Sequence, residues 1–263
     1  MPATASERLV LRAPTIGRFR APQARTFPTN LERPLPDGLA VSDEPLDAAS
    51  LTALASAMAG FSRGLREFEP ALVDLAAGPG IARLPDGLAW SPSLTAFQLP
   101  AQFRTVTLVE SDSVAYNTLA DRVQRFARRR ERILLLRSTP RAALHDILAY
   151  QPRRAAILAI VHGGSETWDV AVELAESHPH VNLALVIGRS RSSRFQSGRL
   201  VVDAESFASS LDRLGSIGFR YLTDAYGIPP EDPPAGGVLV ATRSRAIHDA
   251  LTAVGGYQQL NLI

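Results

Sequence analysis

The feature that most constrains the fold is an apolar run that ends abruptly in two glycines, at residues 71–80 (Ala-Leu-Val-Asp-Leu-Ala-Ala-Gly-Pro-Gly). Apolar side chains on both sides of Asp74 indicate a buried strand, and Gly-Pro-Gly ends it. Glycine lets a backbone pass close to a ligand because it has no Cβ. In open α/β sheets, ligands lie beyond the carboxyl ends of the strands. The run therefore predicts a nucleotide-type site that includes Asp74, Gly78 and Gly80.

The rest of the chain alternates between strand and helix patterns, which is typical of a parallel α/β sheet. After the first strand, we expect strands at 104–110, 132–136, 155–161, 181–187, 218–225 and 237–242. We expect helices at 51–65, 114–130, 141–150, 168–177 and 206–214. Seven strands that end in a late pair favour a Rossmann-like class I methyltransferase fold, which is an α/β fold with a mostly parallel sheet and helices on both faces. The six-stranded dinucleotide fold fits less well.

The glycine turn departs from the dinucleotide fingerprint, because it lacks a third glycine and Pro79 removes an amide that a pyrophosphate would use. The pattern acid-x-x-x-Gly-x-Gly instead resembles the first motif of S-adenosylmethionine-dependent methyltransferases. That cofactor has no phosphate but carries an ammonium, a carboxylate and a ribose, so an acid beside the turn is chemically reasonable. The alternative is that Asp74 only caps an ordinary turn at the end of a strand.

Glu110 ends the second predicted strand, where an acidic side chain binds ribose hydroxyls through charge-assisted hydrogen bonds. The residues at 111–113 are better caps for the next helix, so we expect Glu110 to be available for a ligand. The alternative is a solvent-facing carboxylate that caps that helix. The third strand ends without an acid for an adenine amino group, and Ser138 is the candidate there.

The spacing between Gly80 and Glu110 is longer than in the compact dinucleotide fingerprint, where the acidic residue follows the glycines by about 20 residues. The excess contains Trp90-Ser91-Pro92-Ser93 and a predicted helix. Asp74-Leu-Ala-Ala-Gly-Pro-Gly80, this insert and Val109-Glu110-Ser-Asp112 together resemble the three-Cys-motif partner family. The late strand at 237–243 also resembles that family's closing strand.

The resemblance covers about residues 50–250. It implies a methyltransferase-like fold found in bacterial and archaeal proteins, inferred binding of S-adenosylmethionine, and a genomic partner that carries three cysteines. It implies that Asp74, Gly78 and Gly80 line the methionine end of the cofactor, that Glu110 binds the ribose, and that Ser91 lies near the cofactor.

One departure from that family follows the fourth predicted strand. The family shows Asp-Pro, then an aromatic or small residue and Gly, which resembles the catalytic loop of amino-methylating enzymes, whereas this chain has Val161-His162-Gly163-Gly164. His162 is therefore the candidate general base, since the unperturbed pKa of histidine lies near neutrality. The alternative is a loop histidine without a catalytic task.

The basic residues are all arginines, which suggests a GC-rich bacterial genome and excludes a phosphate-loop lysine. Arg189, Arg191 and Arg194 follow the fifth predicted strand, and arginine suits the bidentate recognition of phosphate. They are the candidate contacts for a nucleic-acid substrate, with a solvated loop as the alternative. A second cluster at 122–132 is predicted to be a solvated helix end.

The chain contains no cysteine, which excludes disulfides, cysteine-based zinc sites and thiol catalysis. His178 and His180 lack an evident third ligand, so we expect no metal site. No run approaches the ~20 apolar residues of a membrane span, and residues 1–30 lack the apolar core of a secretory signal. We therefore expect a cytoplasmic protein. Residues 1–45 are predicted to form an extended or partly disordered arm, and residues 46–263 a methyltransferase-like domain.

These observations predict an S-adenosylmethionine-binding protein that transfers a methyl group to a nucleic acid or another acceptor. The alternative, favoured by the missing Asp-Pro loop, is a catalytically inactive partner or regulatory subunit of a protein complex. A nicotinamide-dependent oxidoreductase is a third, weaker interpretation.

Overall fold

The computed structural model describes residues 33–42, 48–65, 68–84, 87–98, 103–126, 132–152, 154–162, 165–187, 213–225, 237–253 and 257–261. The strands of its main sheet are β1 (Glu69–Asp74), β4 (Thr105–Glu110), β5 (Ile133–Arg137), β6 (Ala155–Val161), β7 (Val181–Ile187), β8 (Tyr221–Ala225), β9 (Gly237–Thr242) and β10 (Tyr257–Asn261). A separate hairpin pairs β2 (Ile81–Leu84) with β3 (Gly87–Trp90). The helices are α1 (Ala48–Gly64), α2 (Pro92–Gln98), α3 (Ser113–Phe126), α4 (Pro140–Tyr150), α5 (Ser165–Ser177) and α7 (Arg245–Ala253).

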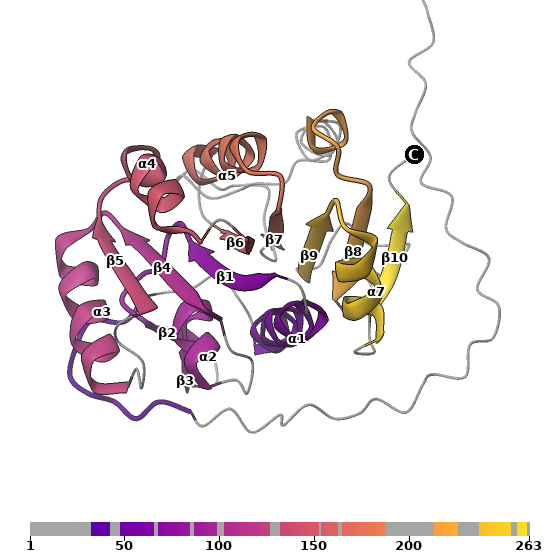
Figure 1. Cartoon of the computed structure of the whole chain (residues 1–263). Coiled ribbons are helices and arrows are strands. Elements are labelled where there is room, and N and C mark those ends of the chain that lie inside the picture. The colour runs from indigo at the N-terminus through magenta and orange to yellow at the C-terminus, as the bar shows by residue number, and fades with distance from the viewer. Residues whose placement is uncertain are drawn as a thin grey trace, which may run out of the picture.

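The main sheet has the strand order β10-β8-β9-β7-β6-β1-β4-β5 (Figure 1). The five strands from β5 to β7 are parallel, β9 is antiparallel to both β7 and β8, and β10 is antiparallel to β8. This arrangement confirms the predicted Rossmann-like fold and its late pair. β10 adds an eighth strand to the seven predicted, because its short Tyr-Gln-Gln-Leu-Asn run lacks an apolar alternation.

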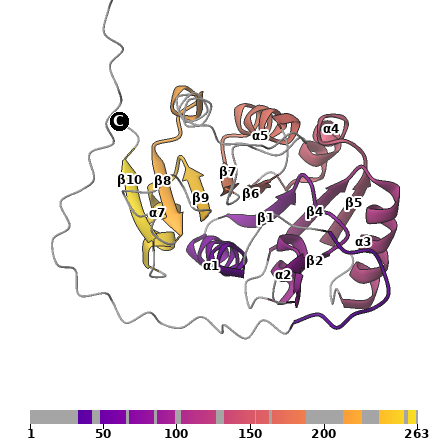
Figure 2. The same cartoon turned by 180° about the vertical axis from the view of Figure 1, so that it is seen from behind.

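Helices cover both faces of the sheet, as Figures 1 and 2 show from opposite sides. One buried cluster joins alternate sheet residues such as Leu72 and Leu108 to apolar side chains from α1, α2, α3 and α7. The other cluster joins the intervening residues, such as Val73, to α4 and α5. The alternation follows from the period of two in a strand, and both faces of β6 are fully buried.

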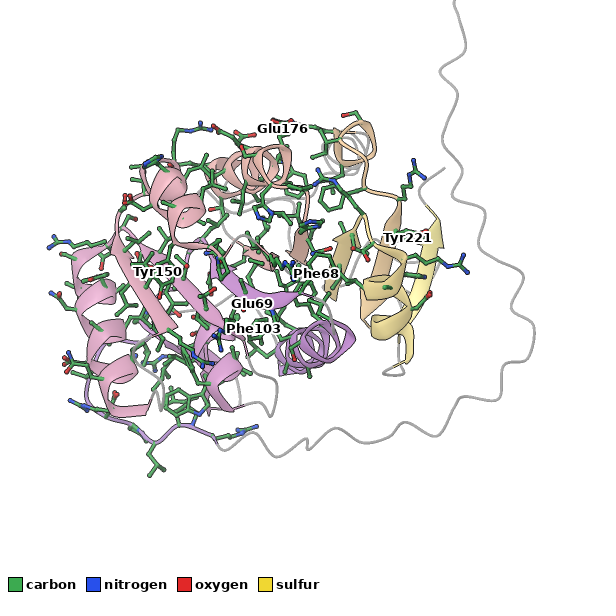
Figure 3. The ribbon with its side chains drawn as sticks, viewed as in Figure 1. Phe68, Glu69, Phe103, Tyr150, Glu176 and Tyr221 are labelled. Carbon is green, nitrogen blue, oxygen red and sulfur yellow. The ribbon has the colours of Figure 1, made fainter. Side chains whose placement is uncertain are left out.

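The sheet has two distinct edges where its parallel strands begin and end. Figure 3 labels Phe68 and Glu69 where β1 begins and Tyr221 where β8 begins, and these residues mark the amino edge. The carboxyl edge lies at the opposite ends of the same strands. In the parts of the chain that the structure describes, no helix has the length and apolar character to cross a membrane.

Candidate functional site

The carboxyl edge of the sheet contains a topological switch point at β1. The chain passes from β1 to β4 on one side, and only later to β6 on the other side. Ligands of open α/β sheets bind at such a point. Asp74 ends β1, Glu110 ends β4, and His162 follows β6, so the fold brings these three predicted site residues to the same edge.

Asp74 is fully buried, and its two oxygens have different surroundings. Oδ1 accepts the N–H of Ala76 at 3.1 Å and lies 3.0 Å from Nε2 of His162. Oδ2 is buried without a hydrogen-bond partner, and no other side-chain atom of the described residues shares that condition. An unsatisfied buried acceptor costs about 1–3 kcal/mol. A cationic ligand group placed at Oδ2 would remove that cost.

The contact between Asp74 and His162 indicates which imidazole nitrogen carries the proton. An ionised carboxylate only accepts hydrogen bonds, so Nε2 must be the nitrogen that carries the proton. In the neutral ring, Nδ1 is then the nitrogen without a proton. The two residues are 88 positions apart, and their proximity follows from the parallel register that sets Asp74 beside Ile160. The sequence shows each residue at the end of a strand but not which strands are neighbours.

Glu110 contacts two backbone amides. Its Oε2 accepts the N–H of Gly78 at 2.9 Å, and its Oε1 accepts the N–H of Asp112 at 2.7 Å. Asp112 caps α3 through the amides of Val114 and Ala115, so Glu110 is not needed as the cap of that helix. A carboxylate offers about four acceptor positions, so Glu110 retains capacity for ribose hydroxyls.

The two glycines of the turn are required for different reasons. Both have left-handed backbones, with φ of +62° at Gly78 and +90° at Gly80. A Cβ on Gly80 would lie 2.6 Å from Cδ1 of Leu94, so a side chain there would require Leu94 of α2 to shift. A Cβ on Gly78 would come no nearer than 3.8 Å to Ser42 Oγ. Contact with a ligand is therefore not needed to explain Gly80.

Ser91 and Ser138 each make a backbone hydrogen bond to another predicted site residue. Ser91 is buried and caps α2, with its Oγ 3.4 Å from the N–H of Leu94, and its own N–H donates to the carbonyl of Gly80 at 2.9 Å. The N–H of Ser138 donates to the carbonyl of Glu110 at 3.2 Å. Their contacts with a cofactor stay predictions. Arg189, Arg191 and Arg194 lie outside the described residues.

Arg122 does not belong to a solvated helix end, so that prediction is wrong for this residue. Its side chain is fully buried. Its guanidinium donates to both oxygens of Asp37 at 2.7 and 2.9 Å, and to the carbonyls of Ala40 at 2.8 Å and Pro79 at 2.6 Å. The hydrogen bond from Arg122 lowers the pKa of Asp37 to about 2. Clustered arginines in a sequence indicate polarity, and only long-range packing decides which of them is buried.

Comparisons with known proteins support the fold and nothing finer. No protein-family model and no curated protein matches this chain. Among solved structures, protein LPL1258 from Legionella pneumophila is similar, with a TM-score of 0.52, 10% identity, and coverage of 81% of this chain and 96% of that chain. The small RNA methyltransferase HEN1 is similar over 84% of this chain and 28% of its own, with a TM-score of 0.50 and 13% identity.

This chain has the Rossmann-like methyltransferase fold. At such low identities the likeness to solved structures carries no conclusion about substrate. The resemblance to the three-Cys-motif partner family is not tested by these comparisons and stays a prediction.

Proposed function

We propose that this protein binds S-adenosylmethionine at the carboxyl edge of β1 and β4, and transfers its methyl group to an acceptor held near His162. The observation that carries the proposal is the buried, unpartnered Oδ2 of Asp74 at the switch point of the sheet. An ammonium group is the ligand chemistry that such an oxygen favours, because a charge-assisted hydrogen bond is stronger than a neutral one.

The residues around Asp74 fit the remaining parts of the cofactor. Glu110 would bind the ribose hydroxyls with its remaining acceptor positions, and Ser138, directly after the neighbouring strand β5, would face the adenine. The bound cofactor supplies an already activated methyl group. The task left to the protein is to orient the acceptor, and positioning of this kind accounts for a large part of enzymatic acceleration.

His162 would remove the proton of the acceptor. The Nε2–Asp74 contact orients the imidazole ring, which is the arrangement expected of a general base held by a buried carboxylate. A nucleic acid remains the proposed acceptor. Its phosphates would be bound by the arginines that the sequence predicts as contacts at 189–194.

The test is calorimetric titration of S-adenosylmethionine into the full chain and two variants. Asp74→Asn and Glu110→Gln each replace a carboxylate by a neutral amide of the same shape. We expect micromolar binding by the wild type and about 10- to 100-fold weaker binding by each variant, since a hydrogen bond to a charged group contributes about 1.5–3 kcal/mol. Glu69→Gln is the control, because Glu69 begins β1 at the amino edge and forms a half-exposed pair with Arg104 there.

Absence of binding by a well-folded wild type would overturn the proposal. A parallel titration with a nicotinamide dinucleotide tests the oxidoreductase interpretation, which tight binding of that ligand would support. If S-adenosylmethionine binds but neither a nucleic acid nor any other acceptor is methylated, the alternative of a catalytically inactive partner or regulatory subunit replaces the transfer step of the proposal.

A further inference from the structure

Arg122 joins three segments that are distant in the sequence. It lies on α3, its guanidinium reaches Asp37 and Ala40 in the N-terminal segment 37–42, and it also reaches the carbonyl of Pro79 in the glycine turn. A fully buried guanidinium requires compensation of its charge, and Asp37 supplies it through two parallel hydrogen bonds. The N-terminal segment is therefore linked to the glycine turn through the buried guanidinium of Arg122 and its ion pair with Asp37.

The segment 37–42 is also anchored at its other end. The N–H of Ser42 donates to the carbonyl of Ile81 at 3.0 Å, and the carbonyl of Ser42 accepts the N–H of Arg83 at 2.7 Å. These bonds place Ser42 beside β2 in a parallel bridge with Ala82. Asp37 and Ser42 thus hold the segment against α3 and the hairpin, on either side of the turn (the indigo stretch in Figures 1 and 2).

Each residue of the glycine turn, from Ala77 to Gly80, has a backbone group that forms a hydrogen bond with another part of the chain. The N–H of Ala77 donates to Val109, the N–H of Gly78 to Glu110, and the carbonyl of Gly80 accepts from Ser91. At Pro79 the contact is the bond from Arg122 to the carbonyl oxygen, at 2.6 Å. This bond depends on the N-terminal segment, because Asp37 of that segment holds the guanidinium of Arg122.

The direction of the Pro79 carbonyl sets the direction of one amide. A trans peptide is planar, so the N–H of Gly80 points opposite to the Pro79 oxygen that Arg122 holds. Pro79 has no N–H, and the N–H of Gly78 is already engaged by Glu110. The amide of Gly80 is therefore the donor that this turn offers to an anionic group of a ligand.

We propose that Arg122, held by Asp37, is a positioning residue that aims the Gly80 amide at the carboxylate of the bound cofactor. Segment 37–42 is then a part of the cofactor site, although none of its residues needs to touch the cofactor. This inference rests on the proposed binding of S-adenosylmethionine. In it, the recognition of the methionine carboxylate depends on the contact between Asp37 and Arg122, which are 85 positions apart in the sequence.

The test compares two ligands on the full chain, S-adenosylmethionine and its decarboxylated form. We expect the wild type to bind the carboxylate-bearing ligand about tenfold more tightly, as one charge-assisted hydrogen bond provides. Asp37→Asn and Arg122→Lys should reduce that preference to about twofold or less, while affinity for the decarboxylated ligand stays nearly constant. Arg243→Gln is the matched control, because Arg243 also donates to several backbone carbonyls but lies at the amino edge.

The preference between the two ligands separates positioning from general stability. If both variants keep the wild-type preference, or lose affinity for both ligands equally and in step with a fall in melting temperature, the positioning role is wrong. If the wild type binds neither ligand, the proposed function fails first and this inference fails with it. Should Arg122→Lys not fold, Asp37→Asn decides the question, and Asp37→Glu should restore the preference in part.

Discussion

The two edges of the sheet are each organised by an arginine, and the two arginines are compensated differently. At the carboxyl edge, Arg122 is fully buried and faces the carboxylate of Asp37. At the amino edge, Arg243 is partly buried and lies 4.5 Å above the ring of Phe219. Its guanidinium donates to backbone carbonyls, among them Ala175 at 2.8 Å and Ile217 at 2.9 Å. Backbone dipoles suffice where water still reaches the charge, whereas full burial calls for a counter-ion.

The pKa values follow from these surroundings. Burial lowers the pKa of Arg243, and the nearby Glu176 opposes that shift. At the other edge, the hydrogen bond from Arg122 lowers the pKa of Asp37 to about 2.

The edges also differ in how completely their buried polar groups are satisfied. At the amino edge, the amide nitrogen of Asn182 donates to the carbonyls of Ile157 and His180, and its Oδ1 accepts the hydroxyl of Thr242 at 2.5 Å. At the carboxyl edge, Oδ2 of Asp74 has no partner. A satisfied network indicates a structural task, and an unsatisfied buried acceptor indicates a place for a ligand.

The largest expected effect comes from removing the counter-ion at the carboxyl edge. Asp37→Ala leaves the charge of Arg122 buried without compensation, which costs about 3–5 kcal/mol of the free energy of unfolding. Urea unfolding followed by circular dichroism measures this loss. A loss below about 1 kcal/mol would mean that Arg122 reaches water in solution, and the contrast between the edges would disappear.

The next effect distinguishes the two glycines of the turn. Gly80→Ala combines a left-handed backbone with a Cβ 2.6 Å from Leu94, and we expect a loss of about 2–4 kcal/mol from strain and overpacking together. Gly78→Ala meets only the backbone penalty, about 1–2 kcal/mol. Thermal unfolding of the two variants side by side measures the difference. Equal losses would mean that α2 moves away to admit the methyl group.

A smaller effect is expected at the amino edge. Arg243→Gln removes donors from several carbonyls that lie partly in water, so the free energy of unfolding should fall by about 1–3 kcal/mol. Affinity for S-adenosylmethionine should not change when it is measured well below the melting temperature. A change in affinity of tenfold or more would show that the two edges are coupled, which contradicts the separate roles given to them here.

The smallest effect is a dependence on pH that belongs to Asp37. Its folded-state pKa of about 2 is below the usual value of 3.8, so its ion pair contributes stability above pH 4 that is lost as the pH falls towards 2. Allowing for its partial exposure, the contribution is about 1–2 kcal/mol. Stability measured from pH 5 to pH 2 should fall less steeply in Asp37→Asn than in the wild type. Parallel curves would mean that Asp37 is not paired in solution.

Much of the fold could be predicted from local patterns. β6, β7 and β9 coincide with the predicted 155–161, 181–187 and 237–242, because continuous apolar runs bounded by turn residues define buried strands. The hairpin of β2 and β3 was not predicted, since four-residue strands are too short to show a period.

Local apolar patterns place Asp74, Glu110 and His162 at strand ends, because they depend on residues that are near one another in the chain. Two contacts could not be predicted in this way: Asp74 lies beside His162, and Arg122 pairs with Asp37, across 88 and 85 positions respectively. Strand order and helix packing set these contacts, and both depend on burying apolar surface between segments far apart in the chain. An arginine near the end of an amphipathic helix has the same local pattern whether it faces water or the carboxylate of a distant aspartate.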